Sequence, residues 1–339
     1  MQNNNIFQKT YTRDTTLIMQ QLWIEAFNQA ISRFKVSKNF SVIVVDYIKN
    51  GVIEVWENSK FIELIKSTLF KFCNDYPNEA IILLKEYTKE LDKIEKICGK
   101  DTVYTKIIDL KRFILKIKKL VLGDLFISYI GEDERLAGKA KDIAYQLRSK
   151  DHYFLNNNRV IRESLRTIFP TLSDYVNVIK LDELDEIPLL SECKHRFKNF
   201  VYASNGYSHI GSVKEYGEKN NLIFKEEKAD FEDKKIKGMI ANRGRAIGHI
   251  KLVFSTRDLN KVQSGDIIVS PMTTVDMMSA IKKCSAIVTD EGGTICHAAI
   301  ISRELDKPCI VATKNASNIL KDHDRIEVNA DEGIISILD

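Results

Sequence analysis

This 339-residue sequence lacks paired cysteines, long apolar runs and a large excess of either charge. Its six cysteines are scattered without a CxxC pair, which excludes an evident zinc site or disulfide framework and favours reduced thiols. No apolar run approaches the roughly 20 residues that span a bilayer, and the polar N-terminus has no signal-peptide core. We therefore expect a cytoplasmic protein with no membrane partner.

The charge balance gives no argument for a nucleic-acid partner, because 51 Lys and Arg face 47 Asp and Glu and leave a net charge of +4. With 44% hydrophobic and 29% charged residues, the composition is that of a soluble globular protein with room for two ordinary domains. The P-loop pattern is also missing, so the sequence predicts no ATP site of that kind.

The first two thirds of the chain predict a mainly helical domain over residues 1–228. Asn50-Gly51 between two β-rich runs predicts one hairpin, and Asn156 to Asn158 predict a turn. Apolar residues recur at helical spacing in the segments 15–34, 61–69, 79–97, 101–122, 131–148 and 159–168.

The predicted helix 101–122 has two contrasting sides. Its apolar side would hold Ile107, Ile114, Ile117 and Val121. Its basic side is interpreted as a solvated face, and the alternative is a docking surface for an acidic partner or a phosphorylated ligand. The basic residues are Lys111, Arg112, Lys116 and Lys119.

A charged segment divides the chain in two. Residues 225–238 have little apolar content, so we predict a linker at 229–237, although an ordinary surface loop would have the same composition. Short strands then alternate with short helices, which predicts a compact α/β domain at 238–339 and an α+β protein of two domains. The expected strands are 247–254, 266–270, 285–289, 309–312, 325–328 and 334–338, and the expected helices are 275–283, 297–305 and 316–320.

One stretch within this second domain has a chemical interpretation. A predicted strand runs into a turn that contains Gly292 and Gly293, and a helix then opens with His297. Glycines permit a close backbone approach, the N–H groups of a helix start favour an anion, and a neutral imidazole is a nucleophile. A phosphate carried on His297 is one interpretation, and a purely structural strand, turn and helix is the other.

The stretch Val288 to Val311 resembles the signature of the phosphohistidine swivelling domain in phosphoenolpyruvate-utilising enzymes. That family includes phosphoenolpyruvate synthase, pyruvate phosphate dikinase and rifampicin phosphotransferase, and the resemblance extends from Gly238 to Leu338. The matched positions are Thr289, Gly292, Gly293, Cys296, His297, Ala298, Ala299, Arg303, Glu304, Leu305 and Pro308.

Four positions depart from the family pattern. Asp306, Ala312 and His323 stand where the family usually or frequently has Gly, so loop geometry is in question. Ile295 stands where the dikinases have a regulatory threonine, so regulation by phosphorylation is not expected.

The resemblance implies that His297 is the catalytic nucleophile. Gly292, Gly293 and the helix start would hold the phosphoryl oxygens. Thr289 and Thr294 could add hydroxyl donors, or could satisfy their own turn instead. Two supporting residues follow from the helix: Cys296, for which packing is the favoured role, and Glu304, which lies near the face of His297 and could orient its imidazole.

The resemblance also implies partners. Relatives carry a nucleotide-grasp module and, in the synthases, a C-terminal barrel, whereas this sequence ends at Asp339 directly after the carrier domain. We therefore expect ATP and Mg²⁺ on a separate nucleotide-grasp chain, and no metal or cofactor site here. The stretch Tyr175 to Leu184 loosely resembles the family's region before the carrier domain, which suggests that the helical domain binds a small-molecule acceptor, pyruvate or another organic hydroxyl compound. A non-catalytic binding or regulatory protein is the alternative.

Overall fold

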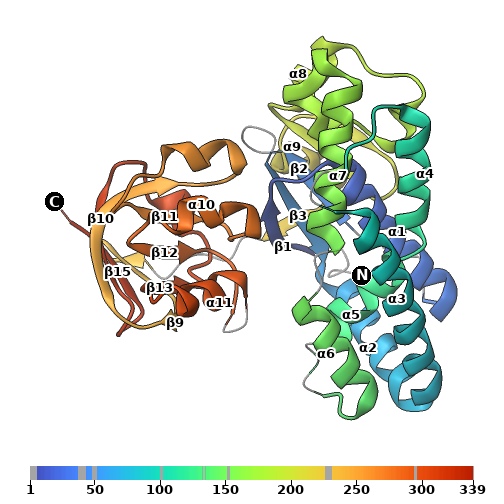
Figure 1. The fold of residues 1–339 in the computed structure, drawn as a ribbon, viewed down its shortest axis with the longest axis horizontal. Coiled ribbons are helices and arrows are strands. Elements are labelled where there is room, and N and C mark those ends of the chain that lie inside the picture. The colour runs from blue at the N-terminus through green and yellow to red at the C-terminus, as the bar shows by residue number, and fades with distance from the viewer. Residues whose placement is uncertain are drawn as a thin grey trace. The chain divides into compact units, whose positions relative to one another are not determined.

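The structure, a computed structural model, describes residues 6–36, 43–47, 52–99, 102–131, 133, 135–150, 153–225, 231–293 and 296–338. The chain forms two compact units. The first comprises Thr15–Phe224 with the start of the chain up to Gln8, and the second comprises Lys225–Asp339 with Lys9–Asp14. Figure 1 labels the elements of both. No helix in the described ranges is long and apolar enough to cross a bilayer.

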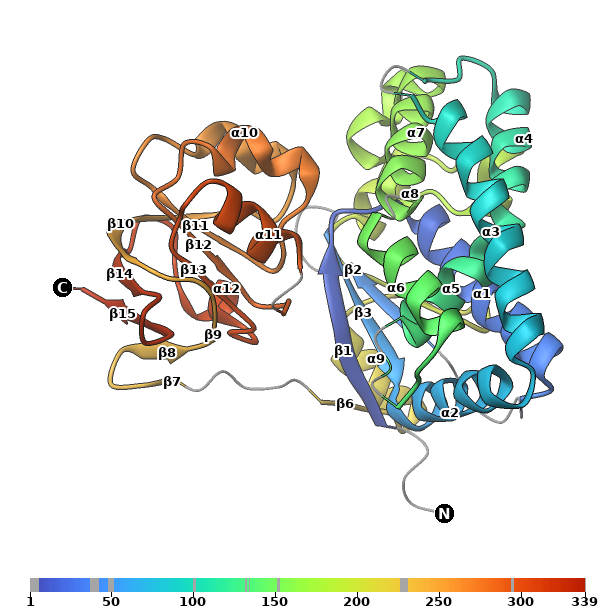
Figure 2. The same ribbon diagram turned by 60° about the horizontal axis from the view of Figure 1, so that its bottom comes forward.

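A six-stranded sheet forms the frame of the first unit, in the order β5-β4-β2-β3-β1-β6. Figure 2 labels β1, β2, β3 and β6 of this sheet. The predicted hairpin is confirmed as the antiparallel pair β2–β3, with Val45 opposite Val55, and its Asn50-Gly51 turn lies outside the described residues. The other strands were not predicted. The bounds are β1 (Ile6–Arg13), β2 (Ile43–Tyr47), β3 (Ile53–Asn58), β4 (Phe200–Ala203), β5 (Ser208–Ile210) and β6 (Ile223–Lys225).

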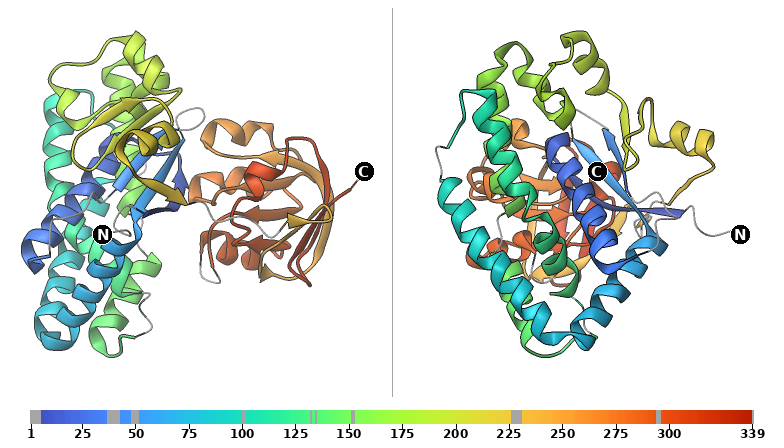
Figure 3. Two further views of the ribbon diagram at one scale, coloured as in Figure 1. Left: turned by 180° about the vertical axis from the view of Figure 1, so that it is seen from behind. Right: turned by 90° about the vertical axis from the view of Figure 1, so that its right-hand side faces the viewer.

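Helices complete the first unit. Trp56 of β3 packs in one apolar cluster with Phe7, Val201, Ala203 and Tyr216, so the segment around α9 covers one face of the sheet (Figure 3). The helices are α1 (Leu17–Phe34), α2 (Ser59–Asp75), α3 (Pro77–Ile97), α4 (Ile107–Lys118), α5 (Val121–Ile130), α6 (Lys139–Lys150), α7 (Tyr153–Ile168), α8 (Leu190–Arg196) and α9 (Val213–Asn220), with 3₁₀ turns η1 (Pro170–Val178) and η2 (Leu181–Leu184).

Two helix predictions and one turn prediction in this unit need correction. The single helix expected at 101–122 is instead two helices. Helix α4 is amphipathic, whereas α5 is apolar on nearly all sides and is buried accordingly. The helix expected at 131–148 begins only at Lys139, after Gly138 with a φ of +93°. Asn156 to Asn158 lie inside α7 rather than in a turn.

The second unit is built on a nine-stranded mixed sheet, in the order β7-β8-β15-β14-β10-β11-β12-β13-β9. Strands β10 to β13 are parallel neighbours, and β11 and β12 pair in register from Ile267 with Ala286 to Ser270 with Thr289. The bounds are β7 (Phe231–Glu232), β8 (Lys235–Lys237), β9 (Met239–Asn242), β10 (Arg245–Leu252), β11 (Ile267–Ser270), β12 (Ala286–Thr289), β13 (Cys309–Val311), β14 (Arg325–Asn329) and β15 (Ile334–Ile337).

Both faces of the parallel strands are buried. Ile268 and Ile287 belong to the core under α10 and α11, whereas Val269 and Val288 belong to the core with α12 and the antiparallel strands. Such strands are apolar on both faces, and helices cover them. The helices are η3 (Thr256–Lys261), η4 (Val275–Met277), α10 (Met278–Ile281), α11 (His297–Glu304) and α12 (Ala316–Ile319). The α+β fold class is confirmed.

Part of the predicted linker is strand. Within 229–237, residues 229 and 230 lie outside the description, and the remainder forms the hairpin β7–β8. Strand β8 pairs with β15, and Ile236 is fully buried in the core of the second unit. One buried isoleucine in a charged run is enough to anchor this edge hairpin, so these residues belong to the second sheet rather than to a solvated tether.

Candidate functional site

The candidate site lies where two parallel strands of the second unit end. The segment 271–274 follows β11, the segment 290–293 follows the fully buried β12, and α11 begins at His297. The carboxyl ends of neighbouring parallel strands meet at one edge of a sheet, where open α/β sheets bind their ligands. This edge therefore brings together side chains that are distant in sequence.

His297 is fixed at this edge by a contact that sequence analysis missed. The Thr273 hydroxyl lies 2.9 Å from Nδ1 of His297, and Thr273 itself is buried. This contact engages Nδ1 and fixes the orientation of the imidazole. The only hint in the sequence was that Thr273 follows the predicted strand 266–270 and therefore lies at its carboxyl end.

Gly292 and Gly293 differ in their backbone geometry. Gly292 has a φ of +115°, and a Cβ there would lie 2.7 Å from Sγ of Cys296, so only glycine fits without a shift. A Cβ added at Gly293 would lie in open space, because no atom lies within 4 Å of its position. Thr294 lies outside the described residues.

The start of α11 adds an anion-binding element. No described side chain caps this helix, which begins at His297 after Cys296. The first-turn N–H groups of Ala298 and Ala299 therefore have no acceptor within the helix, and they lie one and two residues from the imidazole. This arrangement favours a negatively charged group beside His297.

Thr289 and Asp290 build the turn rather than the phosphate site. Thr289 is fully buried, and its hydroxyl donates to the carbonyl of Glu291 at 2.7 Å, so the structure gives it the turn role. The Asp290 carboxylate accepts the Ser317 N–H at 2.9 Å and also the Ser317 hydroxyl. Burial raises the pKa of Asp290 above its ordinary value, against the effect of the Ser317 hydrogen bonds. These bonds tie the end of β12 to α12.

The two supporting residues occupy different environments. Cys296 is half-buried and packs against the core under α11, which fits a packing role. Glu304 is exposed, and in the described part of the chain no hydrogen bond joins it to His297; Thr273 makes the orienting contact instead. Arg303 donates to the carbonyl of Ala241 at 3.2 Å.

The three positions at which glycine was expected keep a left-handed backbone. Asp306 has a φ of +50°, Ala312 of +56° and His323 of +73°. Residues with a Cβ rarely adopt this conformation. The loops around the site therefore keep the geometry that glycine would favour, although the side chains differ.

Comparisons with known proteins agree with this site. Residues 262–333 match the family model of the mobile domain of PEP-utilising enzymes. Over 100 residues the chain is 50% identical to a probable phosphoenolpyruvate synthase of Archaeoglobus fulgidus and 46% identical to one of Methanothermobacter thermautotrophicus. The matches cover 30% of this chain and 13% and 15% of those relatives.

One similarity to a solved structure covers more of the chain. An NMR solution structure of Enzyme I aligns with 80% of this chain and 79% of its own, at 14% identity and a TM-score of 0.25. A TM-score this low supports no argument about how the two units are arranged. By contrast, the family model of the mobile domain matches only residues of the second unit, where His297 and Thr273 lie.

Proposed function

Because residues 262–333 belong to the mobile-domain family of PEP-utilising enzymes, we propose that His297 carries a phosphoryl group between a donor and an acceptor. The observation that carries this proposal is the 2.9 Å contact between Thr273 and Nδ1 of His297 beside an uncapped helix start. The contact orients the nucleophile, and the N–H groups that favour an anion lie beside it at the start of α11. The chain is thus a phosphotransferase component.

The two transfer steps follow from the imidazole chemistry. In the tautomer with a proton on Nδ1, that N–H donates to the Thr273 hydroxyl, and the Nε2 lone pair attacks phosphorus. A P–O bond of the donor breaks as the Nε2–P bond forms. In the second step the Nε2–P bond breaks and an acceptor oxygen takes the phosphoryl group. The acceptor loses one proton, from its hydroxyl or, in pyruvate, from the methyl group as the enol oxygen is formed.

The donor and the acceptor are part of the same proposal. ATP and Mg²⁺ belong to a separate nucleotide-grasp chain, and the acceptor is a small molecule, pyruvate or another organic hydroxyl compound. The similarity to probable phosphoenolpyruvate synthases supports this class of reaction. The six free cysteines are compatible with the cytoplasm as its compartment.

Direct chemical phosphorylation tests the nucleophile without knowledge of the partner. Potassium phosphoramidate transfers a phosphoryl group to reactive imidazoles, and mass spectrometry then locates it on the six histidines. We expect an acid-labile, base-stable label on His297, bonded to Nε2, and its complete loss in His297→Ala. The exposed His249 serves as the internal control for non-selective labelling.

The physiological donor requires a second arm. The full chain is incubated with labelled ATP and Mg²⁺, alone and with the nucleotide-grasp protein recovered from its native cell. Label on His297 only in the presence of that protein supports the split arrangement. Equal labelling of His249 and His297 by phosphoramidate contradicts the carrier proposal, and ATP-dependent labelling by the chain alone contradicts the separate donor chain.

A further inference from the structure

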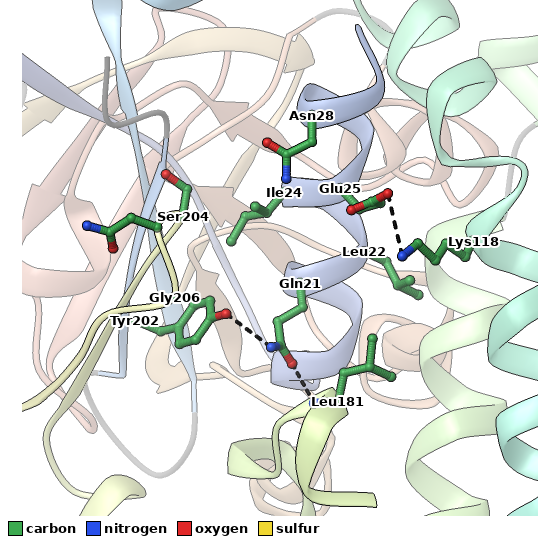
Figure 4. Close-up of a pocket in the computed structure, with 11 residues that line it drawn as sticks. Gln21, Leu22, Ile24, Glu25, Asn28, Lys118, Leu181, Tyr202, Ser204 and Gly206 are labelled. Carbon is green, nitrogen blue, oxygen red and sulfur yellow. Dashed lines mark hydrogen bonds and ion pairs between the residues drawn. The ribbon is translucent and has the colours of Figure 1, made fainter. Parts of the chain in front are cut away.

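The first unit contains an open cavity of about 350 Å³ (Figure 4). Its walls come from α1, the end of α4, the start of η2 and the turn between β4 and β5. The volume is at the lower end of the range for small-molecule sites, which start at about 300 Å³. All of these elements belong to one unit, so the cavity does not depend on how the two units are placed.

One wall is charged but carries no net charge. Lys118 Nζ lies 3.5 Å from Glu25 Oε1, and the amide of Gln29 also donates to this carboxylate at 3.4 Å. Both charged side chains line the cavity and are partly exposed. Because the ammonium is paired with a carboxylate, this wall gives no uncompensated positive charge to an anion such as pyruvate.

The floor is held in place by hydrogen bonds. Gln21 donates to the Tyr202 hydroxyl at 3.1 Å, and its carbonyl oxygen accepts the Leu181 N–H at 2.6 Å. The Tyr202 hydroxyl is the acceptor in the first of these bonds, so its own proton can be donated to a ligand. Figure 4 shows Gln21 between Tyr202 and Leu181.

The remaining lining offers amide groups and apolar surface. Asn205 Oδ1 accepts the N–H of Tyr207 at 3.0 Å within the β4–β5 turn, and its NH₂ group remains as a donor. Asn28 supplies a second, exposed amide from α1. Leu22 and Ile24 give the cavity some apolar surface. The cavity therefore combines several neutral donors and acceptors with a small apolar area.

From these walls we infer that the cavity binds a neutral, polyhydroxylated molecule of about monosaccharide size. Hydroxyl groups both donate and accept, so they can use the amides, the Tyr202 hydroxyl and the Glu25 carboxylate together. The inference deepens the proposed function and rests on it in one respect: it makes this molecule the phosphoryl acceptor. It therefore selects a polyol or sugar over pyruvate.

Binding can be measured without any phosphoryl donor. The full chain is titrated with a panel of monosaccharides, cyclitols and linear polyols, with pyruvate as the anionic comparison, and saturation-transfer NMR detects weak complexes. We expect saturable binding of at least one neutral member and none of pyruvate. Tyr202→Phe and Glu25→Gln should each weaken it about tenfold, since the first removes a hydroxyl donor and the second replaces one acceptor oxygen with an NH₂ group.

The control variant is Glu63→Gln, the same charge change on an exposed position of α2, which should leave binding unchanged. Failure of the whole panel to bind, binding that both pocket variants leave intact, or a preference for pyruvate would each overturn the inference. Since the titration involves no ATP and no label, these outcomes leave the phosphorylation of His297 to be decided separately. Conversely, polyol binding without label on His297 would defeat the proposed function and leave the site standing.

Discussion

The two units differ in the polar groups that they bury. In the described part of the second unit after residue 230, the buried polar side chains are hydroxyls with one carboxylate, Asp290. Among the described residues of the first unit, five charged side chains and several amides are buried. The five are Glu54, Glu57, Asp124, Arg162 and Arg196.

This contrast has a structural cause. In the second unit, hydroxyls such as those of Thr289 and Thr313 satisfy backbone carbonyls, so neutral hydrogen bonds meet most of its buried polar needs. A buried charge needs a partner of opposite charge, as Arg196 of α8 finds in Glu183 of η2. The second unit is thus a platform held mainly by neutral hydrogen bonds, whereas the first unit also depends on buried charge pairs.

Breaking one charge pair should therefore damage the first unit severely. Arg196 donates to both oxygens of Glu183 at 2.7 Å and contacts Glu192 as well. Removing one partner of a buried pair leaves an uncompensated charge, so Arg196→Met should lower the free energy of unfolding by about 3 to 5 kcal/mol. Both tryptophans, Trp23 and Trp56, lie in the first unit, and their fluorescence during denaturation reports this unit alone.

The pH dependence of this effect has a definite sign. Burial alone would raise the pKa of Glu183, but Arg196 and Lys180 lower it below its ordinary value. The pair therefore stabilises the fold above the unfolded pKa, and this contribution is lost as pH falls through the folded pKa. The double variant Arg196→Met with Glu183→Gln should regain much of the loss. A single variant as stable as wild type near neutral pH would show that the pair contributes nothing.

The corresponding perturbation in the second unit removes one hydroxyl. Thr273→Val keeps the shape of the side chain but leaves Nδ1 of His297 without this contact. We expect phosphoramidate labelling of His297 to slow by about 5- to 10-fold, the value of one ordinary hydrogen bond, with Thr273→Ser close to wild type. The imidazole ¹⁵N shifts should also move toward protonation at Nε2. Unchanged shifts in Thr273→Val would refute the orienting role.

Sequence analysis was most accurate where structure is local. The six strands predicted for the second unit are all found within two residues of their ends, because buried parallel strands are short apolar runs bounded by turns. Two of the three predicted helices agree equally well, and the helix expected at 275–283 is the 3₁₀ turn η4 followed by the short helix α10. His297 and Gly292 could be located from one contiguous motif. The contact with Thr273 could not, since that residue lies 24 positions earlier and meets the histidine only in the folded sheet.

The first unit shows why longer-range features were missed. Strand β4 pairs with β2, more than 150 residues earlier, so its four residues gave no local pattern. Asn156 to Asn158 predicted a turn, yet Asn158 lies in α7, where its amide oxygen accepts from the hydroxyl of Thr15 and the N–H of Thr16. A buried tertiary partner outweighs the local tendency of asparagine to end a helix.

The smallest expected effect concerns a residue of the second unit that has a left-handed backbone. Replacing it tests how much backbone strain lowers the stability of this unit. Ala312 follows β13 with a φ of +56°, a conformation that costs a residue with a Cβ about 1 to 2 kcal/mol relative to glycine. Ala312→Gly should therefore stabilise the second unit by about 0.5 to 1 kcal/mol, after the greater freedom of glycine in the unfolded chain is subtracted. Ala246→Gly, in β10 where φ is not positive, is the matched control and should destabilise by a similar amount.

Hydrogen exchange of amides in β11 to β13 measures the stability of the second unit separately from that of the first. Slower exchange in Ala312→Gly and faster exchange in Ala246→Gly are expected, and a loss of protection in Ala312→Gly would mean that the alanine methyl contributes packing that outweighs its backbone strain.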